Sequence, residues 1–241
     1  MKQQFISFMI LFVIGSVSSS NLFATGDLQR GKEKYKVCVA CHGDNGEGIK
    51  HANAPRISGQ QSWYIKRQLV NFMQGIRGNH PEDITGMQMR TMAMTLYTDK
   101  DIEDILSYIG TLDGRAKHSG INGDIESGKS AYSVCVTCHG ANGEGNTALN
   151  SPKIAGLPDW YVERQLHNFK KGIRGVHPKD IYGQQMRPMA MALASNQAIR
   201  DVTAYVSTLK GVSKAKPAGV KSINVAAVVT SPVSEPLYAP C

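Results

Sequence analysis

The sequence predicts an all-α protein built from two tandem helical domains. Three observations predict this fold: an internal repeat, apolar residues at helical spacing, and the lack of a convincing run of strands. Shifting the 241-residue chain by 97 positions aligns it with itself without gaps. Between Trp63 and Leu96, 23 of 34 residues are identical to those between Trp160 and Leu193. A long repeat that occurs twice indicates two small domains, because a solenoid needs more and usually shorter repeats.

The repeat and the changes in composition divide the chain into five segments. We expect a signal peptide at residues 1–24, a first domain at 25–112, a linker at 113–122, a second domain at 123–210 and a flexible tail at 211–241. The linker is polar, and the tail contains lysine, proline and small residues around a short apolar run. Cys241, the last residue, could form an intermolecular disulfide, although a mobile unpaired thiol is the simpler expectation.

The N-terminal segment is typical of a secretory signal. Lys2 supplies a positive charge, Phe5 to Val17 is an apolar run, and small residues follow. Cleavage after Ala24 and cleavage within the serine cluster at residues 18–20 are both compatible with this pattern. A bilayer span needs about 20 apolar residues, so an uncleaved membrane anchor is the less favoured alternative. No later segment is apolar enough to cross a bilayer, and we therefore expect a periplasmic protein. The unusual tail leaves peripheral association with a membrane open.

Each copy of the repeat is expected to contain three helices joined by glycine-rich connections. Asp27 and Asp124 are suited to cap a first helix that runs to a cysteine motif. Aromatic and apolar residues at helical spacing predict a second helix around residues 64–72 and 161–169. The same spacing predicts a third helix around residues 102–112 and 199–209.

The strongest chemical signal is the motif Cys-x-x-Cys-His, which occurs once in each copy. Its residues are Cys38, Cys41 and His42 in the first copy and Cys135, Cys138 and His139 in the second. This spacing is a haem-attachment signature, in which the thiols add to the porphyrin vinyl groups and the histidine binds the iron. A zinc site or a disulfide is disfavoured by the 97-residue separation and the trailing histidines. We therefore expect two covalently bound haem c groups, which would fill the thin cores of such small domains.

The sixth ligand of each iron decides between electron transfer and catalysis, because an open position binds small molecules. The candidates that recur in both copies are Met89, Met92, Met94 and His80, with Met186, Met189, Met191 and His177. A single methionine near an apolar helix is more often core filler than a ligand. Their clustering just before the last helix of each copy nevertheless favours methionine ligation. The two histidines precede prolines and are expected in loops.

Both copies resemble class I cytochrome c domains, and the whole resembles the dihaem cytochromes of the c4 type. The resemblance covers residues 26–209 and rests on the haem motifs and on the methionine-rich runs that end at Leu96 and Leu193. In that family the ligand methionine lies seven residues before such a leucine. This implies Met89 and Met186 as iron ligands, rather than the next methionine of either run. The family fold implies three to five helices around each haem and two haems that lie close together.

Other residues repeated in both copies have smaller predicted roles. Candidates to reach the haem propionates are Tyr64, Arg67 and Arg77, with Tyr161, Arg164 and Arg174. The alternative is that the aromatic residues belong to the core and the arginines to a solvated face. Asp83 and Asp180 are expected in turns or helix caps. No Ser-His-Asp or paired-carboxylate arrangement is found, so no catalytic residue is predicted.

The composition limits the classes of partner. Four haem propionates would lower the formal charge of +8 to about +4, and no arginine-rich stripe with interleaved aromatics indicates nucleic-acid binding. We predict a carrier of single electrons, from a donor such as a quinol-oxidising complex or a dehydrogenase to an acceptor such as a terminal oxidase or reductase. The alternatives are a haem subunit of a larger dehydrogenase or reductase complex, and a dihaem peroxidase-like enzyme. The matching methionine clusters argue against the enzyme, which needs unlike haem environments.

Overall fold

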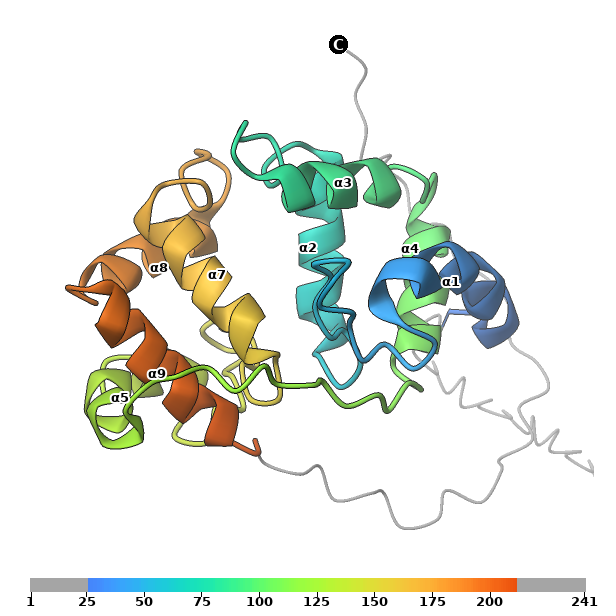
Figure 1. The fold of residues 1–241 in the computed structure, drawn as a ribbon. Coiled ribbons are helices and arrows are strands. Elements are labelled where there is room, and N and C mark those ends of the chain that lie inside the picture. The colour runs from blue at the N-terminus through green and yellow to red at the C-terminus, as the bar shows by residue number, and fades with distance from the viewer. Residues whose placement is uncertain (1–25, 212–241) are drawn as a thin grey trace, which may run out of the picture. The chain divides into compact units, whose positions relative to one another are not determined.

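The computed structural model describes residues 26–211, so the expected signal peptide, most of the tail and Cys241 lie outside the described residues. All regular secondary structure in the described range is helical (Figure 1). Two isolated antiparallel bridges occur, one in each copy, between Ile49 and Ala54 and between Asn146 and Ser151. The prediction of an all-α fold with two tandem helical domains is confirmed.

The first copy is built from α1 (Leu28–His42), α2 (Ser62–Met73), α3 (Ile84–Ala93) and α4 (Asp99–Ile109). Helix α1 packs against α4, and α2 packs against both α3 and α4. The crossing of α1 and α4 is close because Gly31 has no side chain. A Cβ atom there would lie 2.1 Å from the carbonyl oxygen of Asp104.

The second copy is built from α5 (Ile125–Tyr132), α6 (Val136–His139), α7 (Asp159–Lys170), α8 (Ile181–Met191) and α9 (Asn196–Thr208). Helix α5 packs against α9, and α7 packs against both α8 and α9, as in the first copy. The same close crossing recurs, since a Cβ atom on Gly128 would lie 2.0 Å from the carbonyl oxygen of Asp201.

The first helix of each copy begins as expected but does not always continue to the cysteine motif. Asp27 and Asp124 cap α1 and α5 by accepting a backbone hydrogen bond three residues later, which confirms those predictions. Helix α1 reaches the motif, whereas the second copy has a break between α5 and α6, so the expected continuous helix is wrong there. An ion pair between Glu33 and Lys36 supports α1. The equivalent residues, Ser130 and Ser133, are poorer helix formers.

The methionine-rich segments form helices α3 and α8, which residue spacing did not predict. Asp83 and Asp180 cap these helices, accepting hydrogen bonds from Gly86 and Gly183 at 3.1 and 3.0 Å, as expected of cap residues. Both helices carry apolar residues on more than one face, which obscures a single amphipathic stripe. Pro188 inside α8 is a further signal against a helix.

The two copies are joined by a chain segment that is fixed at both ends. The amide of Gly114 donates to Asn45, and its carbonyl accepts from the buried Ser58 hydroxyl at 2.6 Å. At the other end, the buried carboxylate of Asp159 accepts from the backbone amide and the hydroxyl of Ser119 and from the amide of Ile121. The link between the copies is therefore held by specific hydrogen bonds. Within residues 26–211, no helix has both the length and the apolar character needed to span a bilayer.

Candidate haem sites

The motif of the first copy lies at the end of α1. His42 is buried, and its Nδ1 atom lies 2.8 Å from the carbonyl oxygen of Pro55. A carbonyl oxygen can only accept, so Nδ1 carries the proton and Nε2 is left with a free lone pair. Burial lowers the pKa of His42, which favours the neutral imidazole despite the opposing effect of this hydrogen bond. The ring is therefore in the state that binds a metal through Nε2.

The second motif has the same geometry around a shorter helix. His139 is also buried, and its Nδ1 atom lies 2.8 Å from the carbonyl oxygen of Pro152. Burial lowers its pKa in the same way. The agreement between the two sites shows that the histidine orientation does not depend on a continuous helix before the motif.

The cysteines of both motifs are unpaired thiols. Burial raises the pKa of Cys38 and of Cys135 to about 11, while Cys41 is exposed and Cys138 is half-buried. A thiol with a raised pKa stays protonated at neutral pH, so neither Cys38 nor Cys135 is a reactive nucleophile in the bare chain. In each copy, two cysteines therefore lie beside one histidine, as covalent attachment of one haem requires.

The turn that follows each histidine is held by a buried tyrosine. Tyr35 and Tyr132 donate hydrogen bonds of 2.7 Å to the carbonyls of Gly43 and Gly140. Further along the first turn, the amide of Gly48 donates to the His42 carbonyl at 2.9 Å. Gly48 has a φ of +83°, and a Cβ atom there would lie 2.5 Å from the carbonyl carbon of Pro55. The glycine thus lets the chain return close enough for Pro55 to orient the histidine.

One continuous, mainly apolar cavity contains both motifs. Its walls include the cysteines and histidines of both motifs together with the inward faces of α2, α3, α7 and α8. A large apolar cavity with two thiols and a neutral imidazole on its wall fits a covalently attached porphyrin and does not fit a closed zinc site. No group of three or more His, Cys, Asp or Glu side chains within residues 26–211 could hold a metal ion.

The cavity separates the candidate sixth ligands into two groups. Those that line it are Met89, Met92, Met186 and Met189. Met94 and Met191 lie outside it, 54% and 57% exposed, and His80 and His177 are also absent from its walls. Each of these histidines instead accepts a backbone hydrogen bond in its own loop, from Glu82 or Lys179. Bis-histidine ligation by His80 and His177 therefore has no structural support.

Met89 and Met186 are favoured over the second methionine of each run. Met89 packs against the hydrophobic core of the first copy and is half-buried. In the second copy Met186 is half-buried, whereas Met189 is 41% exposed. An iron ligand must be enclosed by protein, so this difference supports the choice that the family resemblance implies. It leaves the assignment of Met89 and Met186 as a prediction.

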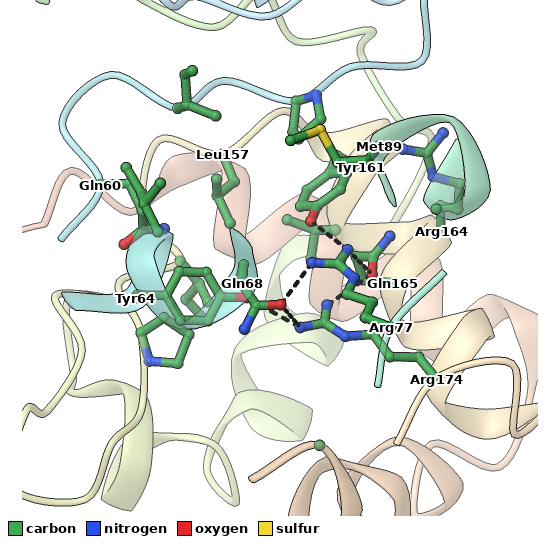
Figure 2. A pocket seen from close by; sticks show the side chains of 18 of the residues that line it. Gln60, Tyr64, Gln68, Arg77, Met89, Leu157, Tyr161, Arg164, Gln165 and Arg174 are labelled. Atoms are coloured by element: carbon green, nitrogen blue, oxygen red, sulfur yellow. Dashed lines mark hydrogen bonds between the residues drawn. The ribbon is translucent and has the colours of Figure 1, made fainter. Parts of the chain in front are cut away.

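Arg77 and Arg174 form a reciprocal hydrogen-bond network between the two copies (Figure 2). Arg77 donates to Gln68 of its own copy at 2.7 Å, and to Tyr161 and Gln165 of the other copy at 3.2 Å each. Arg174 repeats the pattern with exchanged partners, donating to Gln165 at 2.8 Å, to Gln68 at 3.0 Å and to Tyr64 at 3.2 Å. Each guanidinium group thus links the cavity walls of both copies.

Arg67 and Arg164 make a second reciprocal pair of contacts. Each donates to the backbone carbonyl of an asparagine in the other copy at 2.8 Å, Arg67 to Asn150 and Arg164 to Asn53. Both asparagines have φ values near +55°, a left-handed conformation that asparagine tolerates well. These arginines therefore do not form the solvated face that was the alternative expectation.

The network leaves positive charge facing the cavity. The Nε atoms of Arg77, Arg164 and Arg174 are buried and have no hydrogen-bond partner among the described residues. Burial favours neutral Tyr161, but the charges of Arg77 and Arg174 outweigh burial and lower its pKa. Unsatisfied cationic donors on an otherwise apolar cavity fit the carboxylate groups of haem propionates. The cavity thus matches both the apolar body and the charged edge of haem.

The sequence predicted the residues of this network but not its role as an interface. The available signal was the identity of Tyr64, Gln68 and Arg77 with their partners 97 residues later. Reciprocal contacts about an approximate two-fold axis require the same residue types on both sides. A contact between the copies that has no counterpart 97 residues away leaves no such signal in the sequence. An example is the side chain of Gln60, which donates to the carbonyl of Lys153 at 2.9 Å.

Comparisons with known proteins agree with these sites. The cytochrome c family model matches the chain twice, at residues 28–113 and 125–210. Cytochrome c4 of Azotobacter vinelandii is 31% identical over 199 residues, which cover 77% of this chain and 90% of that protein. A thiosulfate dehydrogenase electron acceptor of Stutzerimonas stutzeri is 27% identical over 165 residues, covering 64% and 72%. The crystal structure of reduced cytochrome c4 from Pseudomonas stutzeri superposes with a TM-score of 0.59 and 29% identity, covering 76% and 99%.

Proposed function

The chain belongs to the dihaem cytochromes c of the c4 type, with two covalently bound haem c groups and a role in electron transfer. From this premise we propose that it is a periplasmic carrier of single electrons and not an enzyme. The observation that carries this proposal is the equivalence of the two sites. Each has a buried neutral histidine held by a proline carbonyl and a half-buried methionine on the cavity wall. Two closed sites of one kind suit a carrier, whereas a peroxidase-like enzyme needs one open site.

The proposed roles follow from where the residues lie. Thioether bonds would form at Cys38 and Cys41 for the first haem and at Cys135 and Cys138 for the second. Axial ligands would be His42 with Met89, and His139 with Met186. When bound, each haem iron alternates between the ferric and ferrous states and so stores or releases one electron.

The chain's own residues set the conditions for this exchange. The Pro55 carbonyl fixes the tautomer of His42 and makes the imidazole a stronger ligand, and Pro152 does the same for His139. A thioether ligand favours the reduced iron and raises the reduction potential. Arg77 and Arg174 would neutralise propionates at the boundary between the copies, so that one charged network borders both sites.

The partners that we propose are redox proteins on either side of this carrier. A donor would be a quinol-oxidising complex or a dehydrogenase, and an acceptor would be a terminal oxidase or reductase. The relative named as an electron acceptor of thiosulfate dehydrogenase supports a dehydrogenase as one class of donor. Export through the signal at residues 1–24 would place the protein in the periplasm. Covalent haem attachment would take place there, and the proposed redox partners would be accessible from there.

Carbon monoxide binding tests the carrier proposal against the enzyme. Carbon monoxide binds ferrous haem at an open axial position, so the reduced carrier should bind it slowly and incompletely at both haems. A Met89→Ala variant is the positive control, since it should open one site and bind rapidly with half the total amplitude. Rapid binding by one haem of the wild type would contradict the proposal and favour a peroxidase-like enzyme.

A further inference from the structure

We propose that the outer face of α8 in the second copy is a docking surface for an acidic redox protein with an apolar centre, and that α3 in the first copy is not. This inference rests on the proposed electron-carrier function and adds which of the two haem domains meets such a partner. It is carried by two observations, an exposed apolar stripe and a difference in charge between the copies.

An apolar stripe runs along the outside of each methionine-rich helix. In α8 the exposed apolar residues at helical spacing are Ile181, Pro188 and Met191, with the polar Gln184 between them. The opposite side of the same helix carries Met186, which lines the cavity. A protein seated on the stripe would thus be separated from the cavity by one helix, about 10 Å thick. Helix α3 has an equivalent exposed stripe, so the stripe alone does not distinguish the copies.

The charge around the stripe does distinguish them. Between residues 170 and 191 the second copy has five basic residues and one acidic residue, a net charge of +4, whereas residues 73–94 of the first copy have a net charge of zero. Three positions account for the whole difference. They are Met73, Gln74 and Glu82 in the first copy and Lys170, Lys171 and Lys179 in the second.

These lysines lie around α8 and two of them are free to meet a partner. Lys171 and Lys179 are exposed, and neither takes part in an ion pair among residues 26–211. Lys171 precedes Gly172, whose Cβ position is 3.6 Å from the guanidinium group of Arg187 on α8. Lys170 instead donates to the carbonyl of Leu193 just beyond α8. A basic rim around an apolar centre steers an acidic partner and then excludes water from the contact.

Charge also argues against the two other occupants of this surface. A second copy of the chain paired through the same face would place lysines against lysines, because a two-fold interface is self-complementary. The C-terminal residues 212–241 contain three lysines and one glutamate, so they carry the same sign as the rim. An acidic partner is therefore the occupant that the surface fits.

A gold electrode coated with carboxylate- and methyl-terminated thiols provides a probe with the expected chemistry. The full holoprotein with Lys171→Gln and Lys179→Glu should exchange electrons with this surface about tenfold more slowly at low ionic strength, with a weaker salt dependence. The control Lys32→Glu with Lys129→Gln has the same change in charge at exposed positions of α1 and α5, and should stay within about twofold of wild type. Equal slowing by both variants, or no slowing by the first, would overturn the proposal.

A charge-neutral exchange tests position directly. Adding Gln74→Lys and Glu82→Lys to the first variant restores the net charge of the wild type and moves the rim to α3. The fast exchange should return, but the first haem should now be reduced before the second. A wild-type dimer that dissociates with Ile181→Ser, or cross-links from Lys171 or Lys179 to residues 212–241, would also overturn the proposal. Equilibrium redox titrations of every variant separate this proposal from the carrier function. If each variant still has two one-electron haems, the carrier function is retained even when the docking prediction is wrong.

Discussion

The two copies of the repeat are nearly the same where they face the cavity and differ where they do not. Both orient a buried histidine on a proline carbonyl at 2.8 Å. The first copy, however, buries Ile105, Leu106 and Ile109 on its last helix, where the second copy has the smaller Val202, Thr203 and Val206. Leu106 of the first core is replaced by Thr203, which is buried and has no hydrogen-bond partner for its hydroxyl among the described residues. The haem site is therefore common to both domains, whereas the packing that stabilises each domain around it differs.

A buried carboxylate shows the same contrast. Asp104 accepts from Arg30, from Lys100 and from the amide of Asp27. Its counterpart Asp201 accepts from the amide of Asp124 at 2.8 Å and from the uncharged side chain of Gln197 at 2.7 Å. The first copy therefore joins its first and last helices by charge, and the second does so by neutral hydrogen bonds.

The largest expected effect is the loss of covalent haem. Replacing Cys135 and Cys138 by serine should unfold most of the second copy, because the smaller apolar side chains on its last helix leave the domain more dependent on haem. The matched Cys38→Ser and Cys41→Ser variant should leave the first copy partly folded, since Ile105, Leu106 and Ile109 bury more apolar surface than their counterparts. Hydrogen exchange measured separately over residues 26–112 and 123–210 would show the difference. Equal loss of protection in both variants would show that the two domains are equally stable without haem, which would contradict this prediction.

Loss of an axial methionine should change one haem at a time. Met89→Ala should convert the first haem to the high-spin state and lower its potential by on the order of 0.1 V, within the roughly 0.8 V range that axial ligands span. Met186→Ala should do the same to the second haem. Absorption and paramagnetic resonance spectra check this, with Met92→Ala and Met189→Ala as controls that stay low-spin. A high-spin haem in a control and not in its test variant would reverse the ligand assignment.

The buried carboxylates should differ in their response to substitution. Asp104→Asn should lower the free energy of unfolding by on the order of 2 kcal/mol, because it leaves two cations without their partner. Asp201→Asn should cost less than half of this, since only neutral donors are affected. Thermal unfolding at neutral pH gives both values. An equal decrease in the free energy of unfolding for both variants would show that the charges of Arg30 and Lys100 do not stabilise the first copy.

The same carboxylate predicts an acid-sensitive step. Desolvation favours protonation of Asp104, but hydrogen bonds from Lys100, Arg30 and Asp27 outweigh it and lower the pKa to about 2. Because the folded pKa lies below the unfolded value of about 3.9, this contribution is present above pH 4 and is lost as the pH falls towards 2. Asp104→Asn should therefore reduce the loss of stability across this window, as acid titrations of unfolding would detect.

The interface arginines should affect both haems at once. Arg77→Met removes a positive charge that borders both sites, so it should lower both potentials by roughly 50 mV, as expected for a charge about 10 Å away in a medium of intermediate dielectric. Arg174→Met should have a similar effect because its contacts are reciprocal. Lys32→Met, a charge on the exposed face of α1, is the control and should change neither potential appreciably. A shift confined to one haem would show that the network does not border both sites.

The sequence predicted the parts of the fold whose physical signals are local. The caps at Asp27 and Asp124 and the apolar stripes of α4 and α9 depend on residues a few positions apart, and these predictions were correct. Helices α3 and α8 were missed because one face points to a cavity and another is exposed and apolar, which removes the usual pattern. The arginine network was found only as repeated residues, since its contacts join positions more than 80 apart. Long-range contacts of this kind leave no periodic signal in one sequence.

A spectroelectrochemical titration of the purified holoprotein tests the central claim most directly, namely that each copy holds one low-spin haem with histidine and methionine ligands. We expect two one-electron transitions of equal amplitude, with both haems low-spin in the oxidised and reduced states. Both should show the absorption signature of histidine–methionine ligation. A single transition, a haem that is high-spin in either state, or ligation by two histidines in either copy would contradict it.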